Sequence, residues 1–223
     1  MDVSRRDPFA LDDQAPDTPP KAAAAPNSAP AAPKLALAEW SLHREIRLRP
    51  SVHLDLAHLA RETFGFEGVE YQTSFFPDKA TNFAYLAEMK KRADDAGVKI
   101  VLVEVVDAGP LGADDEGARY GAIERHFPWI AAAAFLGCES VSIAAEGFGS
   151  GAPYLDWMAD SLRRLAAIAD GYGIDVLVGN RVGLACDGSW TAALMKKTAH
   201  PRVGTHPHSD NFDLGAGHPY PRY

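Results

Sequence analysis

Residues 99–106 read KIVLVEVV: after the lysine, large apolar side chains follow one another and Glu104 interrupts them. Such a run is typical of a strand in a parallel sheet that is buried on both faces. An amphipathic segment, residues 82–96, precedes it with apolar side chains at near-helical spacing, and Gly97 follows as a helix stop. The stretch therefore predicts a helix that leads through a short turn into a buried strand.

The same order of elements repeats on both sides of this stretch. The expected strands are residues 35–40, 68–71, 99–106, 140–145, 174–178 and 202–205, and the expected helices are 52–64, 82–96, 116–136, 155–170 and 189–198. Six strands thus alternate with five helices, which is the signature of βα units and a parallel sheet.

This order fits either a doubly wound sheet or a (β/α)₈ barrel. A dinucleotide-binding sheet would carry G-x-G-x-x-G after its first strand, where residues 40–43 read WSLH instead. The glycine-rich residues 147–151, GFGSG, continue without the lysine of a phosphate loop. The barrel is therefore favoured, and no nucleotide cofactor is predicted.

Composition and charge exclude several classes of partner. The chain has 223 residues, of which 47% are hydrophobic and 23% charged, as in globular proteins. Its 22 basic and 30 acidic residues give a net charge of −8, which argues against binding to nucleic acid or anionic membranes. No apolar run approaches the ~20 residues of a membrane span. Cys138 and Cys186 are too few for a disulfide framework, and we interpret them as a buried thiol and a loop thiol.

The first 34 residues differ from the rest of the chain. They hold seven of the sixteen prolines beside an alanine-rich run, which predicts a disordered leader over residues 1–34. Residues 4–9, SRRDPF, faintly resemble a twin-arginine export motif, but the apolar region of such a signal is missing. A cytoplasmic location is therefore favoured, and export through a degenerate signal is the alternative.

Five strings resemble, in order, the sugar phosphate isomerase/epimerase family. They are AEWSLH (38–43), GFEGVEY (65–71), KKRADDAGV (90–98), AFLGC (134–138) and HPRVGT (200–205), and the match runs from Leu35 to Tyr223. The resemblance implies a xylose isomerase-like TIM barrel and a role in carbohydrate metabolism. It also implies a divalent metal ion (Mn, Mg, Zn or Co) at the mouth of the barrel. The implied chemistry is proton transfer on a small sugar or sugar phosphate, with a carboxylate as base.

The chain departs from this family at the metal ligands. Where the family shows ENHGGL after the fifth strand, residues 179–184 read GNRVGL, so Gly179 stands at a ligand position and Arg181 at a histidine position. After the sixth strand, His208 stands where the family has a ligand aspartate. In an extended segment His206, His208 and Asp210 would project to one side, which predicts a substitute metal site. The alternative is a surface loop with chance histidines.

Further candidate site residues lie on or after the expected strands, and all except Glu104 stand at positions that match the family. Glu70 and Glu104 are the candidate catalytic carboxylates. The alternatives are solvent exposure or a structural salt bridge for Glu70, and an edge position that faces water for Glu104. Four further residues are candidates for binding a sugar: Trp40, His43, Asn180 and Asn211. For these the alternatives are that Trp40 is a core residue, that His43 is an exposed loop residue, and that the asparagines form turns.

Length is short for a closed barrel. Without the leader, residues 35–223 number 189, whereas such barrels typically have ~250. We therefore expect a partial TIM-barrel domain without the seventh and eighth units, which would expose two sheet edges and an apolar interior. The leading hypothesis is an isomerase or epimerase that uses a metal ion in proton transfer on a small sugar or polyol. The alternative is an inactive, truncated relative that binds a sugar or partner chain, or completes its barrel as a homo-oligomer.

Overall fold

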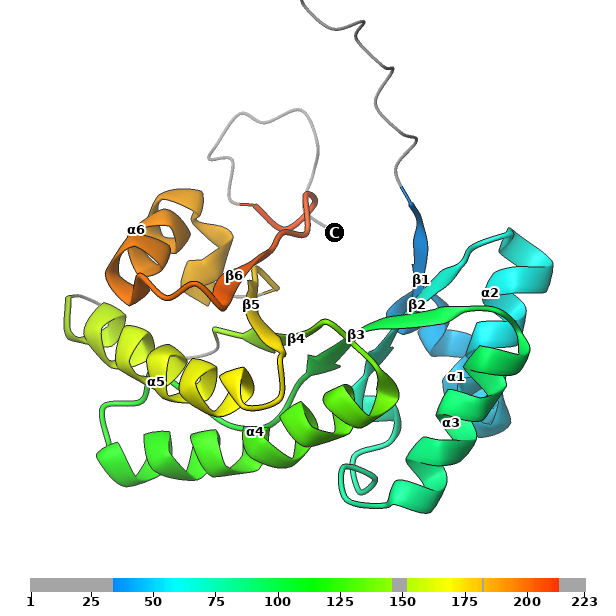
Figure 1. Ribbon diagram of the computed structural model, residues 1–223. Coiled ribbons are helices and arrows are strands. Elements are labelled where there is room, and N and C mark those ends of the chain that lie inside the picture. The colour runs from blue at the N-terminus through cyan, green and yellow to red at the C-terminus, as the bar shows by residue number, and fades with distance from the viewer. Residues whose placement is uncertain (1–33, 146–151, 182, 213–223) are drawn as a thin grey trace, which may run out of the picture. The chain divides into compact units, whose positions relative to one another are not determined.

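The computed structural model describes residues 34–145, 152–181 and 183–212 (Figure 1). Within these residues one sheet holds six parallel strands in chain order. The strands are β1 (Ala36–Ala38), β2 (Gly68–Gln72), β3 (Lys99–Val105), β4 (Ser140–Ala144), β5 (Asp175–Gly179) and β6 (Val203–His206). A doubly wound sheet would reverse its strand order at a switch point, so this order confirms the predicted partial barrel.

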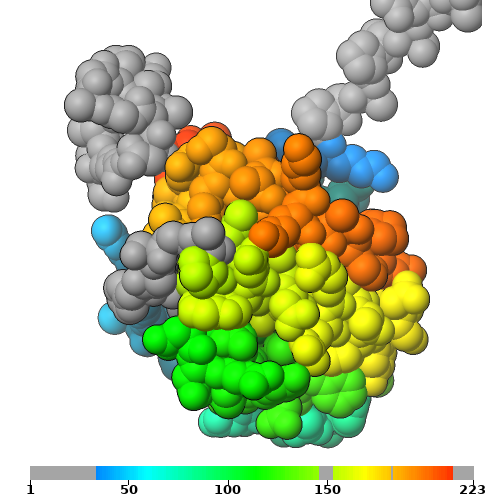
Figure 2. Space-filling model, turned by 90° about the vertical axis from the view of Figure 1, so that its left-hand side faces the viewer, coloured from blue at the N-terminus to red at the C-terminus, as the bar shows by residue number. Residues whose placement is uncertain are grey.

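The helices cover one face of the sheet. They are α1 (His43–Leu48), α2 (Leu56–Phe64), α3 (Phe83–Asp95), α4 (Glu116–Leu136), α5 (Ala152–Asp170) and α6 (Gly188–Thr198). From α2 to α6 each helix packs against the next, and Figure 2 shows α4, α5 and α6 following one another across the surface. In the described part of the chain, no helix has the length and apolarity needed to cross a membrane.

The predicted helix ends reflect capping residues. Gly137 ends α4 in the left-handed conformation, with φ +85°, and Gly65 ends α2 in the same way, with φ +70°. Asp115 caps the start of α4, where its side chain accepts a hydrogen bond of 2.6 Å from the Ala118 N–H. These local signals explain why the bounds of α4 agree with the prediction.

The segment after β1 differs from the prediction. The expected helix over 52–64 is a 3₁₀ turn, Pro50–His53, followed by α2, and α1 was not predicted. Pro50 separates α1 from this 3₁₀ turn, because the residue before a proline is pushed out of the helical region; Arg49 has φ −138° and ψ 84°. The described chain thus has six α-helices rather than five. The first strand is also shorter than predicted, since Glu39–Leu42 form a 3₁₀ turn.

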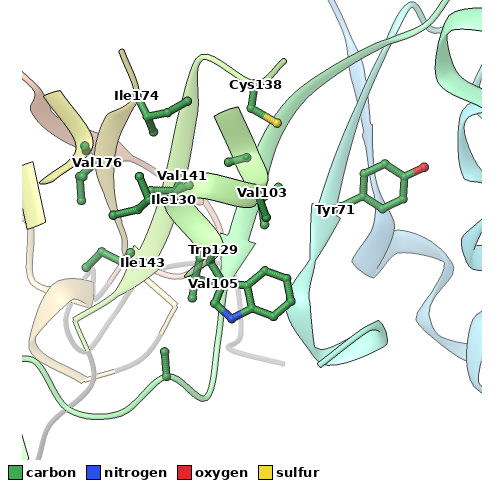
Figure 3. Close-up of a cluster of buried hydrophobic side chains, with 14 of the residues drawn as sticks. Tyr71, Val103, Val105, Trp129, Ile130, Cys138, Val141, Ile143, Ile174 and Val176 are labelled. Carbon is green, nitrogen blue, oxygen red and sulfur yellow. The ribbon is translucent and has the colours of Figure 1, made fainter. Parts of the chain in front are cut away.

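The two faces of the sheet differ in polarity, although β3 carries buried side chains on both, as predicted: Val103 is 0% and Leu102 4% exposed. Val103, Val141 and Val176 point to the helix side and lie with Trp129 and Ile130 of α4 in the main core (Figure 3). The opposite face carries polar side chains in register, as Gln72 pairs with Glu104 and Glu104 with Ser142. The inner face at this level is therefore polar rather than an exposed apolar interior.

Several predicted features lie outside the described residues. Residues 1–33 of the predicted leader, which include the arginine pair of residues 4–9, are not described, and neither are the glycine-rich residues 147–151. Of the two cysteines, Cys138 is buried as expected, and burial raises the pKa of its thiol to about 12. Cys186 is half-buried.

Candidate functional site

A group of ionisable side chains lies at the carboxyl ends of the strands on the polar inner face. We call it the mouth cluster and define it as Glu70, Glu104, Arg181, His206 and His208. His206 Nε2 lies 4.0 Å from Glu70 Oε1, although β6 and β2 are far apart in the sequence. His206 Nδ1 is hydrogen-bonded to Ser142 Oγ at 3.1 Å. The curvature of the sheet thus brings together three strands that are not neighbours in it.

Glu104 is held by two partners. Arg181 Nη1 lies 2.8 Å from Glu104 Oε2, and Gln72 Nε2 donates a hydrogen bond to the same oxygen at 2.8 Å. Ser74 Oγ in turn donates to Gln72 Oε1 at 2.6 Å. The other carboxylate oxygen of Glu104 is buried and has no hydrogen-bond partner among the described residues. It is therefore an acceptor that a ligand hydroxyl would satisfy.

Trp40 lies beside this cluster and is 41% exposed, so it is not a core residue. His43 stacks on it at a ring distance of 4.7 Å and donates from Nδ1 to its carbonyl oxygen at 2.8 Å. The guanidinium groups of Arg47 and Arg181 lie 5.5 and 5.4 Å from the Trp40 ring centroid. The Trp40 ring thus packs against His43 and the two arginines, and it holds Arg181 by a cation–π interaction.

The predicted metal trio separates after β6 ends. The His206 and His208 rings lie 4.7 Å apart, whereas Asp210 is exposed. The alternation expected of an extended segment does not continue beyond His208, because the chain turns there: the Asn211 N–H donates a hydrogen bond to the His208 carbonyl oxygen at 3.1 Å.

The two predicted asparagines have different surroundings. Asn180 is buried and holds the segment after β6 by two hydrogen bonds to the His208 backbone. Its Nδ2 donates to the His208 carbonyl oxygen at 3.0 Å, and its Oδ1 accepts from the His208 N–H at 2.5 Å. Its amide thus holds the backbone at His208 in place, and its predicted hydrogen bond to a sugar hydroxyl stays a prediction. Asn211 lies half-buried in the turn after His208, in agreement with its interpretation as a turn residue.

Burial sets the charge of the mouth cluster. It raises the pKa of the Glu70 carboxyl above its ordinary value, and the charge of Glu104 raises it further while His208 lowers it. Burial also lowers the pKa of His206 and of His208, so both rings are neutral at pH 7. Glu70 is therefore a carboxyl that takes up a proton more readily than usual, which suits a general base.

The substitution Glu104→Gln is expected to lower the pKa of Glu70. The Glu104 charge disfavours ionisation of Glu70, so its removal lets Glu70 ionise at lower pH. A ¹³C NMR titration of labelled glutamate carboxyls measures this change. Glu67→Gln, at an exposed position just before β2, is the control and should leave the Glu70 titration unchanged. An unchanged Glu70 titration in Glu104→Gln would show that the two carboxylates are not coupled.

The described residues do not fit a divalent metal ion. No three histidine, cysteine, aspartate or glutamate side chains among them come together to hold one. A Cβ placed on Gly179 would lie 3.8 Å from His208 Nε2, so the two positions where the resemblance places ligands do lie side by side. Gly179 has no donor atom, however, and Arg181 is itself a cation.

A buried pair behind the mouth was missed by the sequence prediction. Glu39 and His53 are 1% and 2% exposed and are hydrogen-bonded through Glu39 Oε1 and His53 Nδ1. The Gln72 N–H donates to Glu39 Oε2 at 2.8 Å, and burial raises the pKa of Glu39 despite these bonds. The one available signal was a carboxylate near the end of the first expected strand, residues 35–40. Nothing in the spacing links it to His53.

Comparison with known proteins identifies the architecture. A model of the family described as xylose isomerase-like TIM barrel matches residues 57–211. No curated protein matches the chain.

Similar solved structures include three barrels of related shape. One is a D-psicose 3-epimerase in the presence of D-fructose, with 15% identity over 72% of this chain and a TM-score of 0.59. Another is 3-keto-D-glucoside 4-epimerase from E. coli, with 16% identity over 74% and a TM-score of 0.61. A third is the protein IolI with a bound zinc atom, with 15% identity over 78% and a TM-score of 0.61.

The chain covers 58%, 66% and 62% of those three chains, respectively, so it spans about six tenths of their length. At these identities the likeness concerns the fold.

Proposed function

Because the chain belongs to the xylose isomerase-like TIM-barrel family, we propose that its mouth cluster binds a small sugar or polyol and transfers a proton at one of its carbon atoms. The observation that carries the proposal is Glu70: a carboxyl with a raised pKa on the polar inner face, 4.0 Å from His206. The three barrels compared above, two of which are named as sugar epimerases, support the choice of ligand class.

In this proposal Glu70 removes a proton from the carbon next to a carbonyl group of the ligand. The electron pair of the broken C–H bond moves toward the carbonyl oxygen, which gains negative charge and needs a hydrogen-bond donor. Arg181 and His206 are the donors of the mouth cluster closest to Glu104 and Glu70, respectively. Return of the proton from Glu70 to the former carbonyl carbon, with transfer of the neighbouring hydroxyl proton to the other oxygen, gives an isomer. Formation of an epimer requires a proton donor on the opposite face of the carbon. The described residues do not fit a metal ion, so the proposed proton transfer uses only side chains of the mouth cluster.

A second candidate function is sugar binding without turnover. It is favoured by Gly179 and Arg181, which stand at positions where the resemblance places a metal ligand and a histidine. A chain that lost its metal would retain the orphaned Glu104 oxygen and the polar inner face as a binding surface.

Incubation of the protein with D-fructose in D₂O distinguishes the two functions. Proton transfer should place deuterium on a carbon next to the carbonyl group, which ¹H NMR detects as loss of that C–H signal. Calorimetric titration with D-fructose on the same sample measures binding. Binding without exchange would favour the second function, and absence of both would overturn the proposal for this sugar.

A further inference from the structure

Arg181 joins the ends of three strands at the mouth. It follows β5, its Nη1 lies 2.8 Å from Glu104 Oε2 on β3, and its guanidinium carbon lies 5.4 Å from the ring centroid of Trp40, just after β1. Its side chain is 24% exposed, so it is neither a free surface arginine nor fully buried. An ion pair on one side and an aromatic ring on the other fix its place.

The charge of Arg181 has one carboxylate partner in the described structure. Glu104 pairs with the guanidinium, with Nη1 and Oε2 2.8 Å apart. An arginine keeps its charge at every physiological pH and presents five N–H donors in a fixed plane. The guanidinium is therefore a permanent cation, held by Glu104, whose remaining N–H groups can donate to a ligand oxygen.

We propose that Arg181 is the cation with which this site binds an uncharged sugar, so that binding needs no metal ion. The guanidinium donates hydrogen bonds to a carbonyl or hydroxyl oxygen of the ligand, and the orphaned oxygen of Glu104 accepts one from a ligand hydroxyl. A phosphorylated sugar is disfavoured, because its dianion would meet the carboxylates of Glu70 and Glu104 beside an arginine that is already paired. The inference rests on the proposed function and names its ligand class.

The test is calorimetric titration of the full chain with D-fructose and with D-fructose 6-phosphate. Each titration is run after dialysis against EDTA and again with added Mn²⁺. D-Fructose should bind with the same Kd in both conditions, and the phosphate should bind no more tightly.

The variant Arg181→Gln should weaken D-fructose binding about 10- to 100-fold, the expected loss for hydrogen bonds to a charged group. Arg47→Gln is a matched control, because Arg47 lies over the same Trp40 ring at 5.5 Å but extends from the exposed α1. Its Kd should stay within about twofold of wild type. Arg181→Lys retains the charge that pairs with Glu104, so it should fold even if Arg181→Gln fails to fold. Its Kd for D-fructose should lie between those of the wild type and Arg181→Gln.

Different results would overturn different parts of the inference. Binding that EDTA abolishes and Mn²⁺ restores would assign the cation role to a metal ion. Wild-type affinity in both Arg181 variants would remove Arg181 from the site, and tighter binding of the phosphate would reject the uncharged ligand. If neither sugar binds the wild type under any condition, the proposed function itself fails.

Discussion

Replacement of Glu70 by glutamine is expected to slow deuterium exchange into D-fructose by a factor of about 10²–10⁴, the usual contribution of a positioned general base. Glutamine keeps the size and hydrogen-bonding capacity of the side chain but cannot accept the proton. Sugar affinity should change much less, since the ligand is held by Arg181 and Glu104 in our proposal. The rate is measured by ¹H NMR in D₂O at saturating sugar.

Glu67→Gln is the matched control for this variant. Glu67 lies just before β2 and pairs with Arg61 on the exposed surface, with Nη1 and Oε1 3.1 Å apart. Its replacement should leave both the exchange rate and the affinity unchanged. Exchange at the wild-type rate in Glu70→Gln would exclude Glu70 as the base and direct attention to Glu104.

Replacement of Glu39 by alanine is expected to lower the free energy of unfolding by about 3–5 kcal/mol, as when one partner of a buried pair is removed. The change leaves the buried His53 and the Gln72 N–H without their acceptor. His53 Nε2 already has no hydrogen-bond partner among the described residues, so the ring would lose the contact that satisfies its other nitrogen. Urea denaturation followed by circular dichroism measures the change.

Glu39→Gln separates the hydrogen bonds from the charge. Burial raises the pKa of Glu39 in the folded state, so its contribution to stability is fully present below the unfolded pKa and is lost as pH rises through the folded pKa. Glutamine is neutral throughout and keeps an acceptor for the Gln72 N–H. It should therefore be milder than alanine and should remove this part of the pH dependence. Equal losses in the two variants would show that the charge of Glu39 matters more than its hydrogen bonds.

Local signals made most of the fold predictable. Helix α4 follows from an aspartate cap, an apolar run and a terminal glycine, each of which acts within a few residues. The segment 39–55 was not predictable in this way, because its short helix α1 and two 3₁₀ turns depend on Pro50 and on packing. The burial of β3 was predictable from its apolar run, whereas Glu104 was the sole sign in that run that the inner face carries polar side chains.

The candidate site was predictable only in part. Glu70 and Glu104 follow from their places on expected parallel strands, and His206 from side-chain alternation in the segment after the sixth strand. The pairings of Arg181 with Glu104 and of Glu39 with His53 arise from sheet curvature and turn geometry. Since no spacing rule connects such residues, the sequence could not indicate which side chains would neutralise one another.

The sequential strand order has a consequence for how the chain folds. Each strand pairs with those nearest to it in sequence, as in Leu37 with Val69, Val69 with Ile100, and Val141 with Val176. Every strand pairing therefore closes a chain loop of similar, modest length, and no described strand pairs with a strand far away in the sequence. The sheet can grow one βα unit at a time as the polypeptide leaves the ribosome, so a lesion in a late unit should spare the assembly of the earlier ones.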